Sequence, residues 1–326
     1  MRNRFVRTAV AFGAAAALTM GMAACGSDTS GGGSAESGSD DGAGAAGGDY
    51  KVALLVSTLN NPFFVDLRDG AQDAAKDAGI KLEVSDAQND SITQANQAQD
   101  AKSQGYDAVI INPVDSDAAG PSVQELIDAG IPVISVDRTV EGVEVTSHIA
   151  SDNVAGGEQA AVALAAAMSD AGEAVVLQGV PGTSASRDRG EGFETGISAF
   201  SDITVVAKQT ANFDRAEGLD VTTNLLQAHP GVTGIFAEND EMALGAVQSL
   251  GSRAGSDVMV FGFDGTEDAL DAIEAGTMVG TIAQQPRLLG ATAVETALAI
   301  LKGDTVDTVV DVPVTTVTKE NVADFK

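Results

Sequence analysis

The sequence has no tryptophan, and aromatic residues make up only 4% of its 326 residues. Its single cysteine excludes an intramolecular disulfide and a cluster of thiolate metal ligands. The two histidines, His148 and His229, lie in no metal-ligand spacing, so we expect neither a metal nor a cofactor. Basic residues are also few: 18 Lys and Arg stand against 47 Asp and Glu, a net charge of −29. Phosphate backbones and anionic lipids repel such a chain, which disfavours nucleic-acid binding.

The first residues have the build of a secretory signal. Three arginines precede a mostly apolar stretch, 8–22, which is shorter than a typical membrane span. The stretch ends in M-A-A-C at 22–25, which resembles a bacterial lipobox, although Met22 stands where Leu is usual. We therefore predict a signal peptide at 1–24 and lipidation of Cys25. The alternative is an ordinary signal peptide followed by an incidental free cysteine.

Residues 25–49 consist almost entirely of Gly, Ser, Ala and Asp. Such a segment buries too little apolar surface to fold, so we expect a flexible tether. Gly42, Gly44 and Gly47 satisfy the pattern G-x-G-x-x-G, but no strand precedes them and no helix follows. The dinucleotide-binding interpretation therefore fails in its own context, and the glycines belong to the linker.

After the tether, apolar runs typical of strands alternate with helix-length amphipathic segments. Strands are predicted to begin near residues 52, 82, 108 and 132, with a short strand at 145–150, and helices at 62–78, 92–103 and 123–129. The same alternation of strands and helices starts again in the second half, with strands at 174–177, 203–207, 232–237, 258–263 and 278–283 and helices at 153–167, 184–199, 215–228 and 241–250. A last helix at 288–301 precedes extended pieces at 309–317. This order predicts an α/β protein of two lobes, each a parallel sheet flanked by helices.

The stretch 51–64 indicates what such lobes bind. Its apolar run, 52–56, reads as a strand buried on both faces, and Asn61 with Pro62 is typical of a helix start. Asn61, Phe63 and Phe64 therefore follow a strand's carboxyl end, where open α/β sheets bind ligands. Rings cover C–H faces and amides meet hydroxyls, so we predict a neutral, polyhydroxylated ligand such as a sugar.

Charged, amide or aromatic residues follow the other predicted strands in the same way, so each lobe has a row of such residues along one edge of its sheet. Two such edges that face each other predict a cleft between the lobes. Taken singly, each residue has a structural alternative. The three Phe rings fit a core, the Asn residues fit turns, Asp137 with Arg138 fits an ion pair, and Asp264 before Gly265 fits a plain turn. Their recurrence at successive strand ends favours a site.

From residue 50 onward the sequence resembles the D-ribose-binding members of the pentose/hexose branch of periplasmic solute-binding proteins, which are components of ABC transporters. The resemblance is carried by S-T-L-N-N-P-F-F (57–64), I-N-P-V-D-S-D-A (111–118), V-D-R (136–138), G-T-S-A-S-R-D-R-G-E-G-F (182–193), A-N-F-D-R (211–215), E-N-D-E-M-A-L-G-A (238–246), G-F-D-G-T (262–266) and T-I-A-Q (281–284). It implies the type I periplasmic binding protein-like fold of two Rossmann-like lobes joined by a hinge. The sugar-contacting positions that it implies are Asn61, Phe63, Phe64, Asn112, Asp137, Arg138, Arg187, Phe213, Asn239, Asp264 and Gln284.

Together with the lipobox, the resemblance implies an extracytoplasmic lipoprotein that binds D-ribose or a related monosaccharide and delivers it to a membrane permease as a monomer. The predicted lobes are 50–151 with 285–313, and 152–284 with 314–326. Another sugar, such as allose or a different pentose, is the alternative ligand. Two further classes of protein compete with this interpretation: an enzyme that uses Asp137 and Asp264 as acid and base, and a sugar-responsive transcription regulator. The arginine and amide neighbours disfavour the enzyme, and the acidic tether in place of a helix-turn-helix disfavours the regulator.

Overall fold

The computed structural model describes residues 49–326. The predicted signal peptide, Cys25 and all of the predicted tether except Asp49 lie outside the described residues, so those predictions are not tested by the fold.

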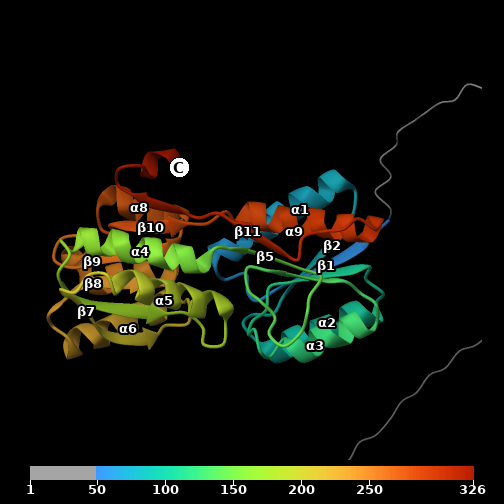
Figure 1. Ribbon diagram of the computed structural model, residues 1–326, viewed down its shortest axis with the longest axis horizontal. Coiled ribbons are helices and arrows are strands. Elements are labelled where there is room, and N and C mark those ends of the chain that lie inside the picture. Colours follow the sequence, from blue (N-terminus) through green and yellow to red (C-terminus); the bar gives the residue numbers. More distant parts are fainter. Residues whose placement is uncertain (1–48) are drawn as a thin grey trace, which may run out of the picture. The chain divides into compact units, whose positions relative to one another are not determined.

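The first lobe is built on a six-stranded parallel sheet in the order β11-β5-β4-β3-β1-β2 (Figure 1). Its strands are β1 (Lys51–Val56), β2 (Lys81–Asp86), β3 (Ala108–Ile111), β4 (Val133–Val136), β5 (Ser147–Ser151) and β11 (Val309–Val312). The strands β3 and β4 are buried throughout, and so is β1 after Lys51, because helices cover both faces of the sheet. The helices α1 (Pro62–Ala78) and α9 (Pro286–Lys302) pack on one face, and α2 (Ser91–Ser103) and α3 (Gly120–Asp128) on the other.

Two glycines allow the late helix α9 to pack closely on α1. A Cβ atom on Gly70 would lie 2.1 Å from the backbone oxygen of Arg287, and one on Gly290 would lie 2.0 Å from that of Leu67. Any side chain at either position would force the helices apart. The contact explains how a segment late in the chain completes the first lobe.

The second lobe repeats the plan around a sheet of order β7-β6-β8-β9-β10-β12, in which only β12 is antiparallel. Its strands are β6 (Gly172–Gln178), β7 (Ile203–Thr210), β8 (Val232–Ala237), β9 (Met259–Asp264), β10 (Gly280–Ala283) and β12 (Thr315–Thr318). One face carries α4 (Asn153–Ala167) and α5 (Ser184–Ile197). The other carries α6 (Arg215–Ala228), α7 (Asp240–Leu250) and α8 (Glu267–Ala275), and α8 is a helix that the periodicity analysis missed.

The predicted two-lobed α/β fold is confirmed, with one sheet in each lobe. The chain passes from one sheet to the other after β5, after β10 and between β11 and β12. These passages are compatible with the predicted lobe limits, whose exact residues stay a prediction. Two short 3₁₀ turns, at Gly251–Arg253 and Val322–Asp324, complete the described elements.

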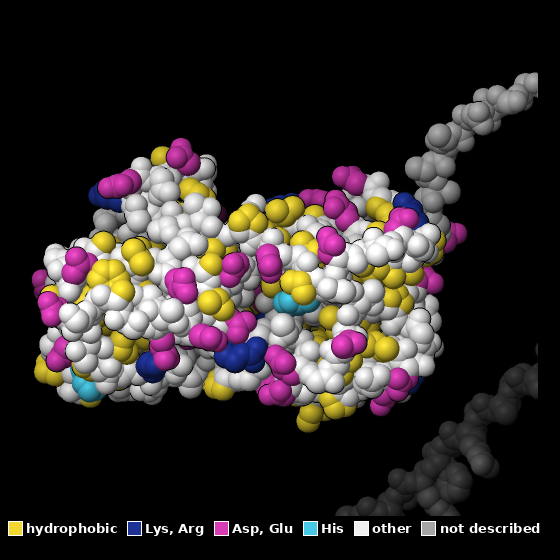
Figure 2. Space-filling view, in the orientation of Figure 1, with side chains coloured by type: hydrophobic (Ala, Val, Ile, Leu, Met, Phe, Trp, Pro, Cys, Tyr) yellow, Lys and Arg dark blue, Asp and Glu magenta, His cyan; other side chains and the backbone are white. Residues whose placement is uncertain are grey.

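Acidic side chains are spread over the visible face of both lobes, whereas Lys and Arg are few there (Figure 2). Within residues 49–326, no helix combines the length and apolar character needed to cross a membrane.

Candidate functional site

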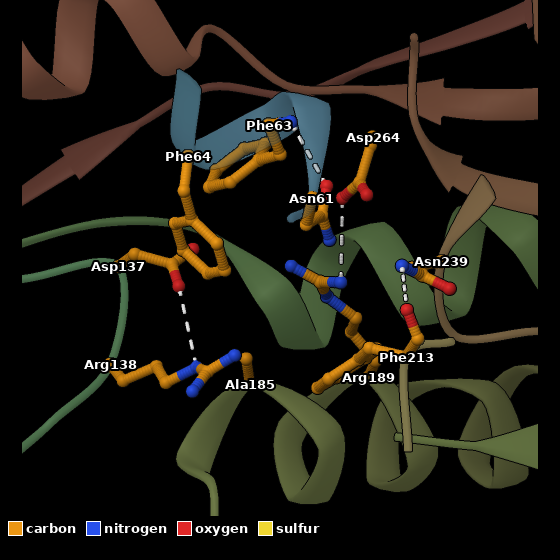
Figure 3. Close-up of a pocket in the computed structure, with 10 residues that line it drawn as sticks. All are labelled: Asn61, Phe63, Phe64, Asp137, Arg138, Ala185, Arg189, Phe213, Asn239 and Asp264. Carbon is orange, nitrogen blue, oxygen red and sulfur yellow. Dashed lines mark hydrogen bonds and ion pairs between the residues drawn. The ribbon is translucent and has the colours of Figure 1, made fainter. Parts of the chain in front are cut away.

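A pocket lies where the strand ends of the two lobes meet (Figure 3). The space between its lining side chains, including its open side, is about 230 Å³. Both lobes contribute side chains, so a bound molecule would touch both. The lining residues are Asn61, Phe63, Phe64, Asp137, Arg138, Ala185, Arg189, Phe213, Asn239 and Asp264.

The aromatic wall of the first lobe is set by the start of α1. The Asn61 side chain accepts a hydrogen bond from the Phe63 backbone N–H at 2.9 Å, and Pro62 occupies the first helical position. Phe63 and Phe64 therefore project from the first turn, with their ring centroids 5.2 Å apart and their planes at 85°. Both rings are buried, and both join the apolar cluster beneath the pocket. The core interpretation of these rings is therefore confirmed, and their contact with a ligand stays a prediction that is compatible with it.

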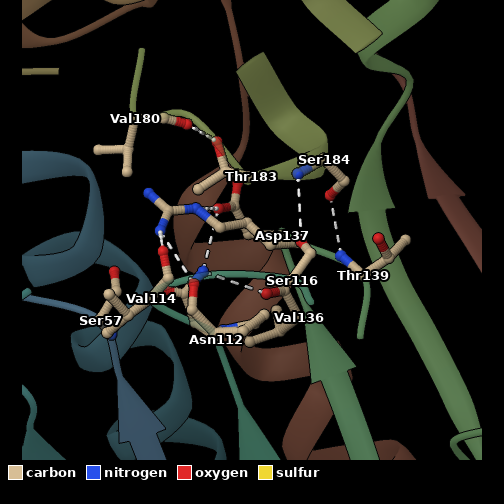
Figure 4. Close-up of polar contacts among 12 residues, drawn as sticks. Ser57, Asn112, Val114, Ser116, Val136, Asp137, Thr139, Val180, Thr183 and Ser184 are labelled. Atoms are coloured by element: carbon tan, nitrogen blue, oxygen red, sulfur yellow. Dashed lines mark hydrogen bonds and ion pairs between the residues drawn. The ribbon is translucent and has the colours of Figure 1, made fainter. Parts of the chain in front are cut away.

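Asp137 and Arg138 follow β4 and are both buried. Arg138 Nε lies 3.6 Å from Asp137 Oδ2, and Arg138 Nη1 donates to the Pro113 carbonyl at 2.9 Å. Asn112 donates to the same Asp137 oxygen at 3.1 Å (Figure 4). Among residues 49–326, Asp137 Oδ1 and Arg138 Nε have no hydrogen-bond partner. An acceptor and a donor that are buried without partners are what a ligand hydroxyl satisfies.

Asp264 and Arg189 form the matching pair in the second lobe, with Nη1 and Oδ1 3.6 Å apart. The Gln284 side chain donates to Asp264 Oδ1 at 2.7 Å. Arg189 is fixed by bonds from Nε to Asn153 Oδ1 at 2.8 Å and from Nη1 to the Glu238 carbonyl at 2.7 Å. Its guanidinium carbon lies 5.8 Å from the centre of the Phe213 ring, the aromatic wall of this lobe.

Burial governs the protonation of the pocket carboxyls. It raises the pKa of Asp137 despite the opposing charge of Arg138, and it raises that of Asp264 despite Arg189. Burial also lowers the pKa of Arg138 to about 10, although Asp137 opposes that change. A hydroxyl that donates to either carboxylate stabilises its ionised form and thereby lowers its pKa.

The backbone is strained at three pocket residues. Asp137 has φ 66°, Phe213 has φ 59° and Asp264 has φ 130°, in a region that residues with side chains seldom occupy. Such conformations gather at functional sites because the surrounding structure must hold them in place. The strain supports a binding role at the same residues that line the pocket.

Three residues that the sequence singled out do not line this pocket. Asn112 lies fully buried behind Asp137, where it also accepts from the Ser57 backbone N–H. Gln284 lies beside Asp264 and lines an adjoining cavity of about 740 Å³, its open side included. Arg187 points to the outside of the cleft, with 53% of its side chain exposed, and pairs with Glu141 at 3.0 Å and Asp188 at 3.2 Å.

Arg189 occupies the place that the sequence analysis assigned to Arg187. Successive helix residues are rotated by about 100°, so the two arginines of α5 lie on nearly opposite faces. Ala185, Phe193 and Ile197 are buried at spacings of four and eight, and Arg189 falls on that same stripe. This periodicity is the signal that could have found it.

The lobes also touch directly beside the pocket (Figure 4). The Thr139 backbone N–H donates to Ser184 Oγ at 2.9 Å, and the Ser184 backbone N–H donates to Ser116 Oγ at 3.2 Å. The Ser116 N–H donates to the Gly182 carbonyl at 3.0 Å, and the Arg187–Glu141 pair bridges the lobes outside these bonds. Opening of the cleft would separate these partners, so the contacts stabilise the arrangement of the lobes seen here independently of a ligand.

Residues 52–305 match the model of the periplasmic binding protein domain family. The chain belongs to that family. It is 50% identical to the ribose import binding protein RbsB of Escherichia coli K12, over 78% of this chain and 86% of the relative. The corresponding Bacillus subtilis protein is 46% identical over 81% and 86%.

Solved structures in the family have the same two-lobed fold. A periplasmic solute-binding protein of an ABC transporter from Actinobacillus succinogenes, with bound D-allose, superposes with a TM-score of 0.80 at 34% identity and covers 84% of this chain and 99% of its own. The Caulobacter myo-inositol binding protein, with bound myo-inositol, superposes with a TM-score of 0.81 at 34% identity and covers 85% of this chain and 96% of its own. In both comparisons almost the whole described chain takes part.

Proposed function

We propose that the chain is the extracytoplasmic substrate-binding lipoprotein of a sugar ABC importer and that it binds D-ribose between its lobes. The observation that carries the proposal is one small pocket in which each lobe places a carboxyl, an arginine and aromatic surface. The relatives named as ribose import binding proteins, at 46–50% identity, support ribose as the ligand.

The chemistry of the lining suits a sugar. Carboxylates only accept hydrogen bonds and guanidinium groups only donate them, so a hydroxyl can donate to Asp137 and accept from Arg138 at once. Asp264 and Arg189 offer the same pairing from the other side, and Asn61 and Asn239 both donate and accept. The rings of Phe63, Phe64 and Phe213 cover the C–H faces of the sugar. Asn112 and Gln284 orient the two carboxyls from behind, and Arg189 takes the role assigned to Arg187 from the sequence.

Titration with a panel of aldoses tests this function. Isothermal calorimetry on the purified protein is expected to give the tightest binding for D-ribose, because an inverted or missing hydroxyl leaves a buried group unpaired. Tighter binding of D-allose would favour the alternative ligand, for which the Actinobacillus structure is the precedent. No binding of any monosaccharide would refute the proposal.

Asp264 is the sharpest single test of the site. The Asp264→Ala variant removes an acceptor from the pocket and leaves Arg189 without its carboxyl partner, so ribose binding should be abolished while the fold persists. Near-normal affinity in a folded variant would contradict the assignment. A product assay with ribose derivatives separates binding from the enzyme alternative, in which the sugar would be altered.

Closure follows from the placement of the pocket. Ligand that contacts both lobes binds the closed form more strongly than the open form and shifts the equilibrium toward closure by that difference. The closed surface is the one that we expect a membrane permease to recognise. We expect a monomer, which size-exclusion chromatography with light scattering checks.

Membrane attachment is assigned to Cys25, the only cysteine. A Cys25→Ser variant, expressed in a host that processes lipoproteins, should move from the membrane fraction to the soluble fraction outside the cytoplasm. Equal membrane association of both proteins would overturn the anchoring.

A further inference from the structure

Asp264 points its carboxyl into the pocket from a backbone conformation that needs support. Its φ of 130° is followed by Gly265 at φ 82°, so two successive residues lie in the left-handed half of conformational space at the end of β9. Asp264 is the one of the two that carries a side chain, and a strained backbone conformation persists only where neighbouring groups hold it in place. The hydrogen bonds of the residues after Asp264 identify the group that holds it.

The holding group is the carboxylate of Asp240, which is fully buried. Its Oδ2 accepts from the backbone N–H groups of Gly265 and Thr266, both at 2.8 Å, and from the Thr266 hydroxyl at 3.2 Å. Its Oδ1 accepts from the Thr281 hydroxyl of β10 at 2.7 Å. The carboxylate therefore ties the two residues that follow Asp264 to the neighbouring strand.

Space for this carboxylate is reserved by the sheet itself. A Cβ atom on Gly262 would lie 2.2 Å from Asp240 Oδ1, so a side chain at that position of β9 would displace the carboxylate. Asp240 is the first residue of α7 and follows the pocket residue Asn239, yet it does not line the pocket. It contacts the turn after Asp264 and not the space that a ligand would fill.

We propose that Asp240 is a positioning residue for ligand binding, which acts by fixing the strained turn at 264–266 and so aims the Asp264 carboxyl at the sugar. The proposal rests on the proposed function, because it names how one of the two pocket carboxyls of that site is oriented. The carboxylate fits the task, since a single side chain here accepts four hydrogen bonds and offers no donor that would compete.

Two substitutions test the contribution of these four hydrogen bonds. Asp240→Ala removes all four bonds, and D-ribose binding measured by calorimetry should weaken by tenfold to a hundredfold. Asp240→Asn keeps an oxygen for the Gly265 and Thr266 N–H groups, and the Thr281 hydroxyl can rotate to accept from the amide. We therefore expect partial rescue, with an affinity between those of the wild type and Asp240→Ala.

A set of single-deoxy analogues of ribose distinguishes positioning from a general loss of structure. The analogue that lacks the hydroxyl bound by Asp264 is the one whose affinity falls least in the Asp264→Asn variant, because it has no bond to Asp264 to lose. If Asp240 acts through Asp264, that same analogue should be the least affected by Asp240→Ala. A purely structural defect would weaken ribose and every analogue by the same factor.

The matched control is Val221→Ala, which opens a cavity in the core of the second lobe away from the pocket. It should lower the thermal unfolding midpoint and leave ribose affinity within twofold. If Asp240→Ala does not fold, Asp240→Asn and Thr281→Val, which removes the Oδ1 bond alone, carry the test with the same analogue profile. The positioning role is overturned if the folded variants bind ribose with wild-type affinity, or if they lose affinity for all analogues by the same factor. A wild-type protein that binds no sugar overturns the proposed function and this inference with it.

Discussion

Arg187 and Arg189 are two residues apart, yet the structure gives them opposite environments, which makes the pair a sharp test of the site. We consider Arg189→Lys and Arg187→Lys, because both changes keep the positive charge and a long side chain. Arg189 is only 4% exposed at its side chain, whereas Arg187 is 53% exposed. The same chemical change is therefore made inside the pocket and outside it.

The expected magnitudes follow from the contacts. Arg189 uses separate nitrogens for Asn153 and the Glu238 carbonyl while facing Asp264, and a single ammonium group cannot reproduce that fork. A hydrogen bond to a charged group is worth about 1.5–3 kcal/mol, so Arg189→Lys should weaken ribose binding by about 2–3 kcal/mol, or roughly 30- to 150-fold. Arg187 makes exposed ion pairs worth about 0–1 kcal/mol, so Arg187→Lys should cost less than about fivefold.

Calorimetric titration of both variants with D-ribose measures this difference. Circular dichroism at the titration temperature establishes that each variant is folded, since Arg189 is buried and its loss also lowers stability. The reasoning fails if Arg187→Lys weakens binding as much as Arg189→Lys does. That result would return the binding role to the arginine that the resemblance indicated.

Three further outcomes are expected. Ser184→Ala removes the acceptor of the Thr139 N–H between the lobes, so it should weaken the binding of ribose and of allose by the same factor, about two- to tenfold. A changed ratio of the two affinities would contradict this expectation. A Cβ atom on Gly179 would lie 2.0 Å from the Phe213 ring, so Gly179→Ala should displace that ring and weaken ribose binding by about tenfold, as seen by calorimetry; unchanged affinity would argue against ring contact with the sugar. Burial raises the pKa of Glu238 from 4.5 to about 7, so between these pH values the folded state binds a proton that the unfolded state releases. The free energy of unfolding should therefore fall by up to about 3 kcal/mol from this group as the pH rises from 4.5 to 7. Chemical denaturation of Glu238→Gln should show a smaller fall, and an identical pH dependence in both proteins would refute the assignment.

Local patterns in the sequence were sufficient for the order of the elements apart from α8, and for the start of α1. The apolar run of β1, the Asn61 cap and Pro62 act within a few residues of one another, so spacing alone predicts them. The short helix α8 was missed because its nine residues follow a polar turn and offer only a brief apolar pattern. The family resemblance supplied the candidate site residues.

The sequence by itself determined that polar and aromatic side chains follow the strand ends, because alternating strands and helices place those ends on one edge of each sheet. Only the tertiary structure decided which of these side chains face the shared pocket. Packing of α5 against α4 turns Arg189 inward and Arg187 outward, and the bonds of Asn112 and Gln284 hold these two behind the carboxyls that they orient. The support of Asp264 by Asp240 likewise joins residues from different strand ends, and no spacing along the chain encodes such a contact.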